Sequence, residues 1–396
     1  MTSNNRWLLP DGIDELLPER AATVEALRRS LLDTCASWGY QYVIPPLVEF
    51  TDSLLVGLGA DLDVLTCKFT DQLSGRTLGV RADITPQVAR IDAHSMPHDA
   101  VTRLCYTGST LHSTAQSVMS GRSPIQLGAE CFGCADLDAD LEVIELMLSL
   151  LGAAPLLLSQ HRALTFDIGH IGVYQALMAD AALGEDVEQA VFDALQRKSA
   201  PDLAEALSRC TADAAASIQS LADLHGGVDV LPQARELLSR SPAALAALDQ
   251  VDSVVARVSK QFPGLAIYVD LAELRGFRYH TGLVFAAYLS GIGAAVAKGG
   301  RYDNVGAVFG RSRPATGFAI DVKALAAAVD GATSSGQVVL APSAGDEALS
   351  QAIDQLRGEG HTVLRELAGN ADSRCSHRLV RQNEAWVVLP LDGVES

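Results

Sequence analysis

The sequence lacks the segments that would place it in or across a membrane. Its first residues, MTSNNRWLLPDG, contain no apolar core of signal-peptide length, and no later run reaches the roughly 18 apolar residues that a membrane-spanning helix needs. Its 7 cysteines are odd in number and scattered along 396 residues, which disfavours a disulfide framework. These absences predict a cytoplasmic protein with reduced, mostly buried thiols and no membrane partner.

Positive charge is also scarce. The 30 lysines and arginines stand against 48 aspartates and glutamates, which gives a net charge of −18. Affinity for nucleic acids is built largely from cations that neutralise phosphates. The balance therefore argues against broad contact with nucleic acid, and we predict no nucleic-acid partner.

Patterns of metal ligands are missing as well. Cys131 and Cys134 form a lone CxxC pair, with no second pair and no histidine cluster nearby. Because a structural zinc ion takes a full tetrahedral set of ligands, packing within a strand is favoured over a zinc or redox role for this pair. We predict no bound metal and no cofactor.

The remaining sequence is typical of a folded protein with more than one unit. It is 48% hydrophobic and 20% charged, and its length exceeds the roughly 100 to 200 residues of an ordinary domain. Apolar residues at helical spacing predict a helix over residues 20–39, followed by a strand that Pro45 and Pro46 interrupt. Further strands are predicted at 64–70, 77–82, 102–108 and 125–132, with a helix at 83–93. This order favours an α+β fold with an antiparallel sheet flanked by helices.

Changes in composition along the sequence indicate a further division of the chain. Residues 173–262 are rich in Ala and Leu at helical spacing and predict a helical insert. Strand-like runs then return, and TGFAIDVKALAAAV at 316–329 predicts a closing helix. After a linker-like DGATSSG, the residues alternate again between strand and helix. We predict a core domain at 1–325 that carries the insert, and a small C-terminal α/β domain at 337–396.

Four stretches carry the polar residues that suggest chemistry: RADIT at 81–85, IQLGAE at 125–130, LRGFRYHTGLVF at 274–285 and KGGRYDNV at 298–305. Strand alternation would place Asp83 and Thr85 on one face, and likewise Gln126 and Glu130. Acids, an amide and a hydroxyl that converge on one cavity would suit an ammonium group and a second polar donor. Taken singly, Asp83 and Glu130 also fit solvated faces or local turns, and GGRYD fits either a ligand contact or a tight turn.

Taken together and in this order, the motifs resemble histidyl-tRNA synthetase over about residues 5–325. GYQYVIPPLVE resembles the helix-strand-proline signature through which class II synthetases dimerise. RADITPQVARI resembles the RPEGT segment of the synthetase, and RLCYTGSTLH through QLGAECFG resembles its second signature. RGFRYHTGLVF resembles its histidine-specific segment RGLDYY, and GGRYDNV followed by RPATGFAIDVKAL resembles its third signature.

The resemblance implies a class II synthetase-like fold with a pocket for free histidine. Asp83 replaces a glutamate and could still meet the α-ammonium group, while Arg275 matches an arginine that contacts the histidine carboxylate. His280 replaces the second of two tyrosines that close around the imidazole. The histidine-binding residues that the resemblance implies are Asp83, Thr85, Gln126, Glu130, Arg275, Tyr279 and His280.

Departures from the synthetase pattern decide which function is expected. The synthetase binds ATP with one arginine in its second signature and another in its third. Here the first run reads Leu111-His112-Ser113-Thr114, and Ala324 stands at the second arginine position. Losing one contact that stabilises charge on a transferring phosphate costs about 3 to 4 kcal/mol. Loss of both predicts a chain with no catalytic residues and no synthetase activity.

The region after Gly336 is also shorter than the anticodon-binding domain of the synthetase. With its synthetase motifs, its two missing arginines and its short C-terminal region, the chain resembles the regulatory subunits of ATP phosphoribosyltransferase. These are non-catalytic relatives of histidyl-tRNA synthetase. This resemblance implies a homodimer within a hetero-oligomer, a short-form catalytic subunit as partner, and feedback inhibition of histidine biosynthesis by L-histidine. Three places for histidine stay open: the inherited pocket, the subunit junction and the partner. An active histidyl-tRNA synthetase and a stand-alone histidine sensor are the alternative functions.

Overall fold

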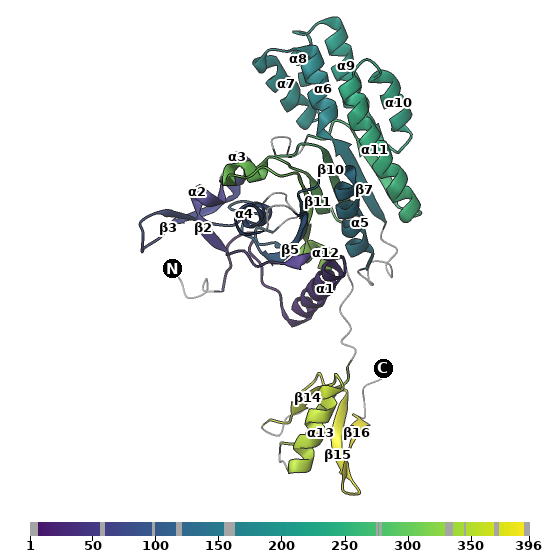
Figure 1. Ribbon diagram of the computed structural model, residues 1–396. Helices are drawn as coiled ribbons and strands as arrows, with labels where there is room; N and C mark the ends of the chain where they lie inside the picture. Colours follow the sequence, from purple (N-terminus) through teal and green to yellow (C-terminus); the bar gives the residue numbers. More distant parts are fainter. Residues whose placement is uncertain are drawn as a thin grey trace. The chain divides into compact units, whose positions relative to one another are not determined.

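The computed structural model describes residues 7–55, 60–96, 100–115, 121–153, 163–274, 276, 279–328, 336–343, 346–367 and 372–391. The chain divides into two compact units, residues 1–330 and 331–396 (Figure 1). The larger unit contains the central sheet and the helical insert. No helix in the described ranges is long and apolar enough to cross a bilayer.

A nine-stranded sheet forms the centre of the larger unit, in the order β1-β5-β6-β12-β11-β10-β7-β9-β8. From β5 to β7 in that order neighbouring strands are antiparallel, whereas β1 runs parallel to β5 and β9 runs parallel to β7. The sheet is therefore mixed: the predicted antiparallel pairing holds from β5 to β7 and for β8 with β9, but not for the pairs β1–β5 and β7–β9. A parallel pair needs a long crossover connection, and the insert between β7 and β9 supplies one. The strands are β1 Gln41–Tyr42, β5 Thr102–Ser109, β6 Ile125–Phe132, β7 Leu164–His170, β8 His225–Gly226, β9 Ala266–Asp270, β10 Leu283–Leu289, β11 Ala295–Arg301 and β12 Ala315–Asp321.

Side chains of β5 alternate between two hydrophobic cores, one on each face of the sheet. Cys105 belongs to the main core, where helices α1 (Pro18–Ser37) and α5 (Leu137–Ala153) pack. Tyr106 belongs to the second core, which includes residues of helix α4 (Thr85–Ser95). Because the polar motifs lie around α4 and the strands beneath it, this second face is where a site can form.

A smaller sheet in the same unit has the order β2-β4-β3. One of its faces carries Gly79, and the Leu54 side chain packs where a Cβ at that glycine would lie. The register places only apolar side chains on the opposite face: Val48, Phe50, Cys67, Phe69, Leu78 and Val80. The elements of this region are β2 Val48–Phe50, α2 Thr51–Leu54, α3 Ala60–Leu65, β3 Cys67–Thr70 and β4 Thr77–Val80.

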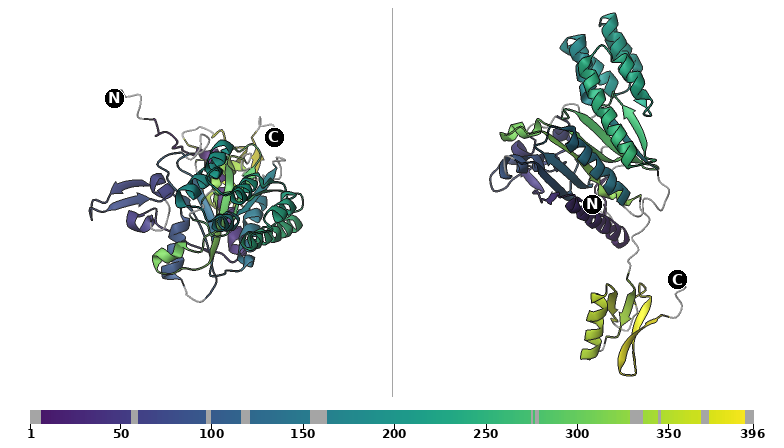
Figure 2. Two further views of the ribbon diagram at one scale, coloured as in Figure 1. Left: turned by 90° about the horizontal axis from the view of Figure 1, so that it is seen from above. Right: turned by 45° about the vertical axis from the view of Figure 1, so that its right-hand side comes forward.

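Helices fill the insert between β7 and β9 and gather in one bundle (Figure 2). In α11, Leu248, Val251, Val255 and Val258 are buried at the three- and four-residue spacing of an amphipathic helix. Ser241 caps this helix, because its hydroxyl accepts a hydrogen bond from Ala244 N at 3.4 Å. The helices are α6 Ile171–Ala181, α7 Glu185–Gln196, α8 Ala200–Leu207, α9 Ala212–Asp223, α10 Val230–Leu237 and α11 Pro242–Gln261.

Two segments of the larger unit differ from the predicted elements. The segment at 316–329, predicted as one helix, continues strand β12 up to Asp321 and only then forms the short helix α12 (Val322–Ala326). β12 pairs with β6 and β11 at its two edges, and its side chains are buried on both faces of the sheet. Periodicity cannot distinguish such a short buried run from a helix. Gly299 and Gly300, for which a tight turn is one interpretation, lie inside strand β11. A 3-10 helix, η2 (Val305–Phe309), follows β11.

The smaller unit is a four-stranded sheet in the order β14-β13-β15-β16, and helix α13 (Glu347–Gly358) packs on one face of it. Asp346 caps α13, because its carboxylate accepts from Leu349 N at 2.7 Å. The other face carries Leu340, Leu364, Val380 and Val387, which are half-buried, and no described helix of this unit covers them. The strands are β13 Val338–Ala341, β14 Thr362–Arg365, β15 His377–Gln382 and β16 Ala385–Pro390.

Candidate functional site

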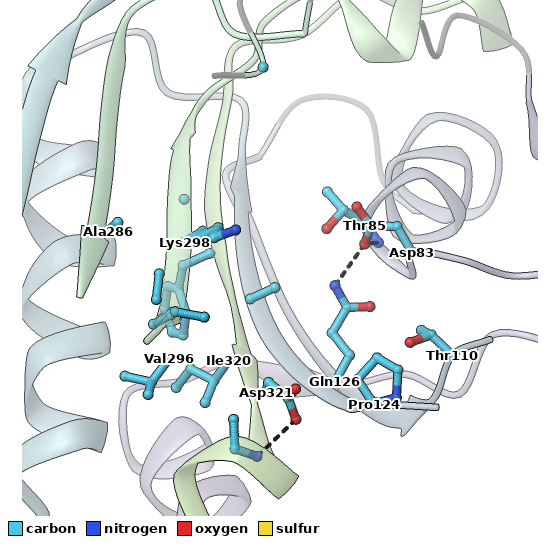
Figure 3. Close-up of a pocket in the computed structure, with 18 of the residues that line it drawn as sticks. Asp83, Thr85, Thr110, Pro124, Gln126, Ala286, Val296, Lys298, Ile320 and Asp321 are labelled. Carbon is cyan, nitrogen blue, oxygen red and sulfur yellow. Dashed lines mark hydrogen bonds between the residues drawn. The ribbon is translucent and has the colours of Figure 1, made fainter. Parts of the chain in front are cut away.

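A cavity of about 1170 Å³ lies against strands β6, β10, β11 and β12 and is bordered by the start of α4 and by α12 (Figure 3). Pockets for drug-sized ligands typically measure about 300 to 1,000 Å³, so this cavity is larger than a single amino acid requires. Arg275, one of the predicted histidine-binding residues, lies outside the described residues. The other predicted residues all line the cavity: Asp83, Thr85, Gln126, Glu130, Tyr279 and His280.

Asp83 and Gln126 face each other at one end of the cavity (Figure 3). Asp83 Oδ1 accepts hydrogen bonds from Gln126 Nε2 at 2.7 Å and from Thr85 N at 3.0 Å. Gln126 Oε1 in turn accepts from Ile84 N at 2.9 Å. The amide therefore holds the segment before α4 in place and orients the Asp83 carboxylate.

The prediction that Asp83 and Thr85 share a face of one strand is wrong. Asp83 lies in a non-strand segment, and Thr85 is the first residue of α4. Pro86 follows directly, and proline suits the first turn of a helix because the backbone N–H groups there have no partner within the helix. The two side chains still reach the same cavity, because the turn that starts α4 brings them together.

Glu130 lies at the buried end of a chain of hydroxyl groups. Tyr106 donates to Glu130 Oε1 at 3.0 Å, and Tyr302 donates to Glu130 Oε2. Thr85 Oγ1 lies 2.9 Å from the Tyr106 hydroxyl. When Glu130 is ionised its oxygens only accept, so the Tyr106 hydrogen is committed to Glu130 and Thr85 must donate to Tyr106. Thr85 then offers a ligand only its oxygen lone pairs.

Burial controls the charge of Glu130, whose side chain is fully buried at 0% exposure. Loss of solvent raises its pKa to about 8, although the hydrogen bonds from Tyr302 and Tyr106 act in the opposite direction. The nearby Asp83 carboxylate raises the pKa further. An empty pocket therefore holds a protonated Glu130 near neutral pH, and a cationic ligand would favour the ionised form.

Aromatic rings form the wall of this end of the cavity. The ring of Tyr279 stacks on that of Tyr302, with centroids 5.0 Å apart and planes 26° apart. His280 meets Tyr279 edge-on, with centroids 5.2 Å apart. The Tyr279 hydroxyl is buried and has no hydrogen-bond partner among the described residues. We call this end of the cavity the amino-acid half, which comprises Asp83, Thr85, Gln126, Glu130 and Tyr279.

Glycines make room for these side chains. The motif analysis left Tyr106 and Tyr302 out of the pocket, and a glycine is a signal that could have revealed the first of them. A Cβ at Gly128 would overlap the Tyr106 hydroxyl, and a Cβ at Gly317 would overlap the Glu130 carboxylate. A glycine inside a strand often marks such a close approach. The glycine in QLGAE thus points to Tyr106, while only the structure brings Tyr302 to Glu130.

The other end of the cavity, which we call the closed half, comprises Asp14, Asp321, Lys323 and Ala324. Lys323 Nζ forms an ion pair with Asp14 Oδ1 at 2.6 Å, and Asp14 also accepts from Ser123 Oγ at 3.2 Å. The hydrogen bond from Lys323 lowers the pKa of Asp14. Asp321 Oδ1 accepts from the backbone N–H groups of Lys323 and Ala324, and burial raises the pKa of Asp321. The lysine charge is therefore already engaged by the protein itself.

The guanidinium of Arg122, the only arginine between Tyr106 and Gln126, is also occupied by hydrogen bonds within the protein. Its Nε donates to His112 O at 2.9 Å and its Nη1 donates to Asp11 O at 3.1 Å, while its backbone N donates to Gly12 O at 2.7 Å. His112, at the first arginine position of the synthetase pattern, has its ring Nε2 at 3.0 Å from Ala82 O. Ala324 stands at the second position and carries no charge. Two other cations, Arg20 and Lys298, line the cavity elsewhere. The geometry thus offers acceptors at one end of the cavity and no guanidinium at either arginine position of the synthetase pattern.

Two family models match the chain. One of histidyl-tRNA synthetase covers residues 12–325, and one of the ATP phosphoribosyltransferase subunit HisZ C-terminal domain covers residues 336–389. A protein of Marinobacter nauticus named ATP phosphoribosyltransferase regulatory subunit is 47% identical over 98% of this chain and 99% of its own length. One of the same name from Pseudomonas fluorescens is 47% identical over 99% and 100%. The chain belongs to the ATP phosphoribosyltransferase regulatory subunit family.

Solved structures agree with the fold of this regulatory-subunit family. A structure from Bacillus halodurans C, described as an ATP phosphoribosyltransferase regulatory subunit/histidyl-tRNA synthetase, has a TM-score of 0.79 at 27% identity and covers 93% of this chain and 95% of its own. Histidyl-tRNA synthetase from Nostoc sp. PCC 7120 has a TM-score of 0.76 at 16% identity, with 97% of both chains covered. The second likeness concerns the fold alone. The larger unit thus has the class II synthetase-like α+β fold.

Proposed function

We propose that this member of the regulatory-subunit family is a non-catalytic subunit that binds free L-histidine and a separately encoded, short-form catalytic subunit of ATP phosphoribosyltransferase. In that role it is required for the first step of histidine biosynthesis and for its feedback inhibition. The observation that carries the proposal is the contrast within one cavity. Its amino-acid half keeps converging acceptors, while the charges of its closed half are paired within the protein.

The amino-acid half suits the two donor groups of histidine. The Asp83 carboxylate and the lone pairs of Thr85 would accept from the α-ammonium, since both are held as acceptors. Glu130 would accept a hydrogen bond from the imidazole N–H. The buried hydroxyl of Tyr279, which stacks on Tyr302 beside Glu130, makes no hydrogen bond to a described residue and would be a second partner for the imidazole. Tyr279, His280 and Arg275 complete the pocket in this proposal.

The closed half supports the absence of synthetase activity. Adenylate formation needs cations aimed at the phosphates, yet Lys323 is paired with Asp14 and the carboxylate of Asp321 borders the space. Histidine-dependent exchange of pyrophosphate into ATP, measured with the purified chain, should stay at the background rate. Exchange above that rate would establish an active synthetase instead.

Exposed apolar residues support a homodimer through the first class II signature. Tyr42, Ile44 and Leu47 are 45%, 77% and 51% exposed, although they are large and apolar. They precede β2, whose sheet presents the apolar face described above. Large apolar residues exposed close together in the sequence fit a protein interface. Ile44→Arg should convert the dimer to a monomer, as measured by light scattering.

The decisive experiment joins the chain to its partner. The chain and a short-form catalytic subunit are purified together, and complex formation, gain of phosphoribosyltransferase activity and inhibition by histidine are measured. We expect histidine to shift the complex between active and inhibited arrangements by a coupling free energy of about 1 to 3 kcal/mol. A chain that binds histidine but neither binds nor activates the catalytic subunit would be a stand-alone sensor.

A further inference from the structure

Tyr302 lines the cavity beside the amino-acid half, and its position differs from that of the other aromatic residues. It follows strand β11 directly, and its hydroxyl donates to one oxygen of Glu130 while Tyr106 donates to the other. One face of its ring stacks on Tyr279, and Phe132 meets it edge-on with centroids 6.4 Å apart. Tyr302 therefore connects the buried acid to the aromatic wall.

The backbone around Tyr302 is fixed on both sides, so its hydroxyl has little freedom to move. The preceding residue, Arg301, forms a buried ion pair with Asp140 at 2.6 Å. The following residue, Asp303, donates its backbone N–H to Thr281 Oγ1 at 3.1 Å and accepts from Ala315 N at 3.0 Å. The backbone N of Tyr302 itself donates to Ala315 O at 2.8 Å. Such a supporting shell is what holds a functional group in one orientation.

The hydrogen bond from Tyr302 has a direct consequence for the role of Glu130. A carboxyl group with a donor on each oxygen is held in a fixed plane, and the two hydrogen bonds stabilise its ionised form against the opposing effect of burial. Only the ionised form can accept from a ring N–H with either oxygen, because a protonated oxygen donates. Removing the Tyr302 donor would leave one Glu130 oxygen buried without a partner and would favour the protonated acid.

We propose that Tyr302 is a positioning residue that holds Glu130 as the acceptor for a ring N–H, so that the pocket prefers an imidazole to a ring of the same shape without an N–H. This inference rests on the proposed binding of histidine in the amino-acid half. A site built to hydrogen-bond an N–H rejects an analogue that lacks it, because the buried acceptor is then unpaired. Tyr302 acts through Glu130 and does not itself need to touch the ligand.

The test compares two ligands on the full chain by isothermal titration calorimetry. L-histidine carries a ring N–H, whereas L-3-(2-thienyl)alanine has a five-membered aromatic ring without one and the same α-ammonium and carboxylate. The Tyr302→Phe variant should weaken histidine binding roughly tenfold and change thienylalanine binding less than about twofold. A purely structural role would weaken both ligands by the same factor, and that result would overturn the proposal.

Tyr40→Phe is the matched control. The Tyr40 hydroxyl also donates to a glutamate, Glu142 at 3.0 Å, but neither residue lines the cavity. This variant should leave the ratio of the two affinities unchanged. If Tyr302→Phe does not fold, Tyr106→Phe removes the other donor to Glu130, and an unchanged affinity ratio in that variant would refute the positioning role of the hydroxyls.

The experiment also separates this inference from the proposed function. If the wild-type chain binds neither ligand, histidine binding in the pocket is refuted, and the preference assigned to Tyr302 falls with it. If the wild-type chain binds histidine selectively and Tyr302→Phe keeps that selectivity, only the role of Tyr302 is refuted.

Discussion

Two aspartates of the cavity share the same local geometry but have different surroundings. Asp83 Oδ1 accepts from the backbone N of Thr85 at 3.0 Å where α4 begins, and Asp321 Oδ1 accepts from the backbone N of Lys323 at 3.0 Å where α12 begins. Asp83 is joined by a side-chain amide and faces a hydroxyl network, whereas Asp321 is followed by a lysine that pairs with Asp14. In the proposed function the same turn presents a carboxylate to histidine in one half, whereas in the other half it forms part of an internally paired charge network. The hydrogen-bond and charge partners of each aspartate, rather than the residue type, therefore distinguish Asp83 from Asp321.

The largest expected effect comes from neutralising each aspartate in turn. Asp83→Asn keeps an oxygen that can accept from Thr85 N and Gln126, but it removes the charge that would meet an α-ammonium. We expect histidine affinity to fall roughly 10- to 100-fold, because hydrogen bonds between charged groups contribute about 1.5 to 3 kcal/mol. The matched control, Asp321→Asn, should change histidine affinity less than about twofold. Equal losses in the two variants, measured by calorimetry, would contradict the division of the cavity into halves.

A second effect concerns the pH dependence of stability in the amino-acid half. The folded chain holds the Glu130 proton up to a pKa of about 8, against 4.5 for the ordinary group. Between these values the unfolded state has lost a proton that the folded state keeps, so stability falls as pH rises. Asp83, Tyr106 and Tyr302 surround Glu130 and are unchanged in a Glu130→Gln variant.

The free energies of unfolding in urea at pH 6 and pH 7 measure this effect. Wild type should lose up to about 1.4 kcal/mol more than Glu130→Gln over that single pH unit. Asp321→Asn serves as a second carboxylate control in the closed half. Identical pH dependences of wild type and Glu130→Gln would show that Glu130 is already ionised in the folded chain.

A third variant tests whether the closed half can be reopened to phosphate. Asp321→Gly combined with Ala324→Arg removes a carboxylate and places a guanidinium where the synthetase pattern has one. One new charge-assisted contact should raise the affinity for ATP about tenfold over wild type. Ala324→Gln in the same background is the uncharged control. Equal ATP affinity in the arginine and glutamine variants would mean that the missing cation is not what excludes the nucleotide.

The smallest expected effect concerns the ion pair of the closed half. Lys323→Ala removes the contact with Asp14, whose side chain is 50% exposed, so the free energy of unfolding should fall by less than about 1 kcal/mol. Histidine affinity should stay the same, because Lys323 does not contact the amino-acid half. A large loss of histidine binding in this variant would show that the two halves are coupled. The measurements are urea unfolding and calorimetric titration.

Much of the fold follows from local sequence pattern. Apolar spacing predicts α1 and α4, and strand predictions at 102–108 and 125–132 agree with β5 and β6. The failures have a common physical cause. Strand β12 is covered on both faces and therefore shows no alternation, and the parallel pairing of β1 and β9 depends on distant strands that no local pattern encodes.

The candidate site shows the same limit. The motifs single out Asp83, Gln126 and Glu130, and the structure places all three around one cavity, although their binding roles stay predictions. Tyr302 could not be placed from sequence, because its contact with Glu130 joins residues 172 positions apart. Likewise, no local pattern pairs Lys323 with Asp14, and only the folded chain shows that Asp14 neutralises it.

The one-sided packing of the smaller unit has a practical consequence. With α13 on a single face, its four-stranded sheet leaves Leu340, Leu364, Val380 and Val387 half-buried on the other, within the described part of residues 336–391. The sheet face that α13 does not cover exposes apolar side chains to water, which is unfavourable. If this segment were expressed alone, we would expect it to self-associate as its concentration rises, and the onset of association should move to higher concentration when Leu364 is changed to Lys.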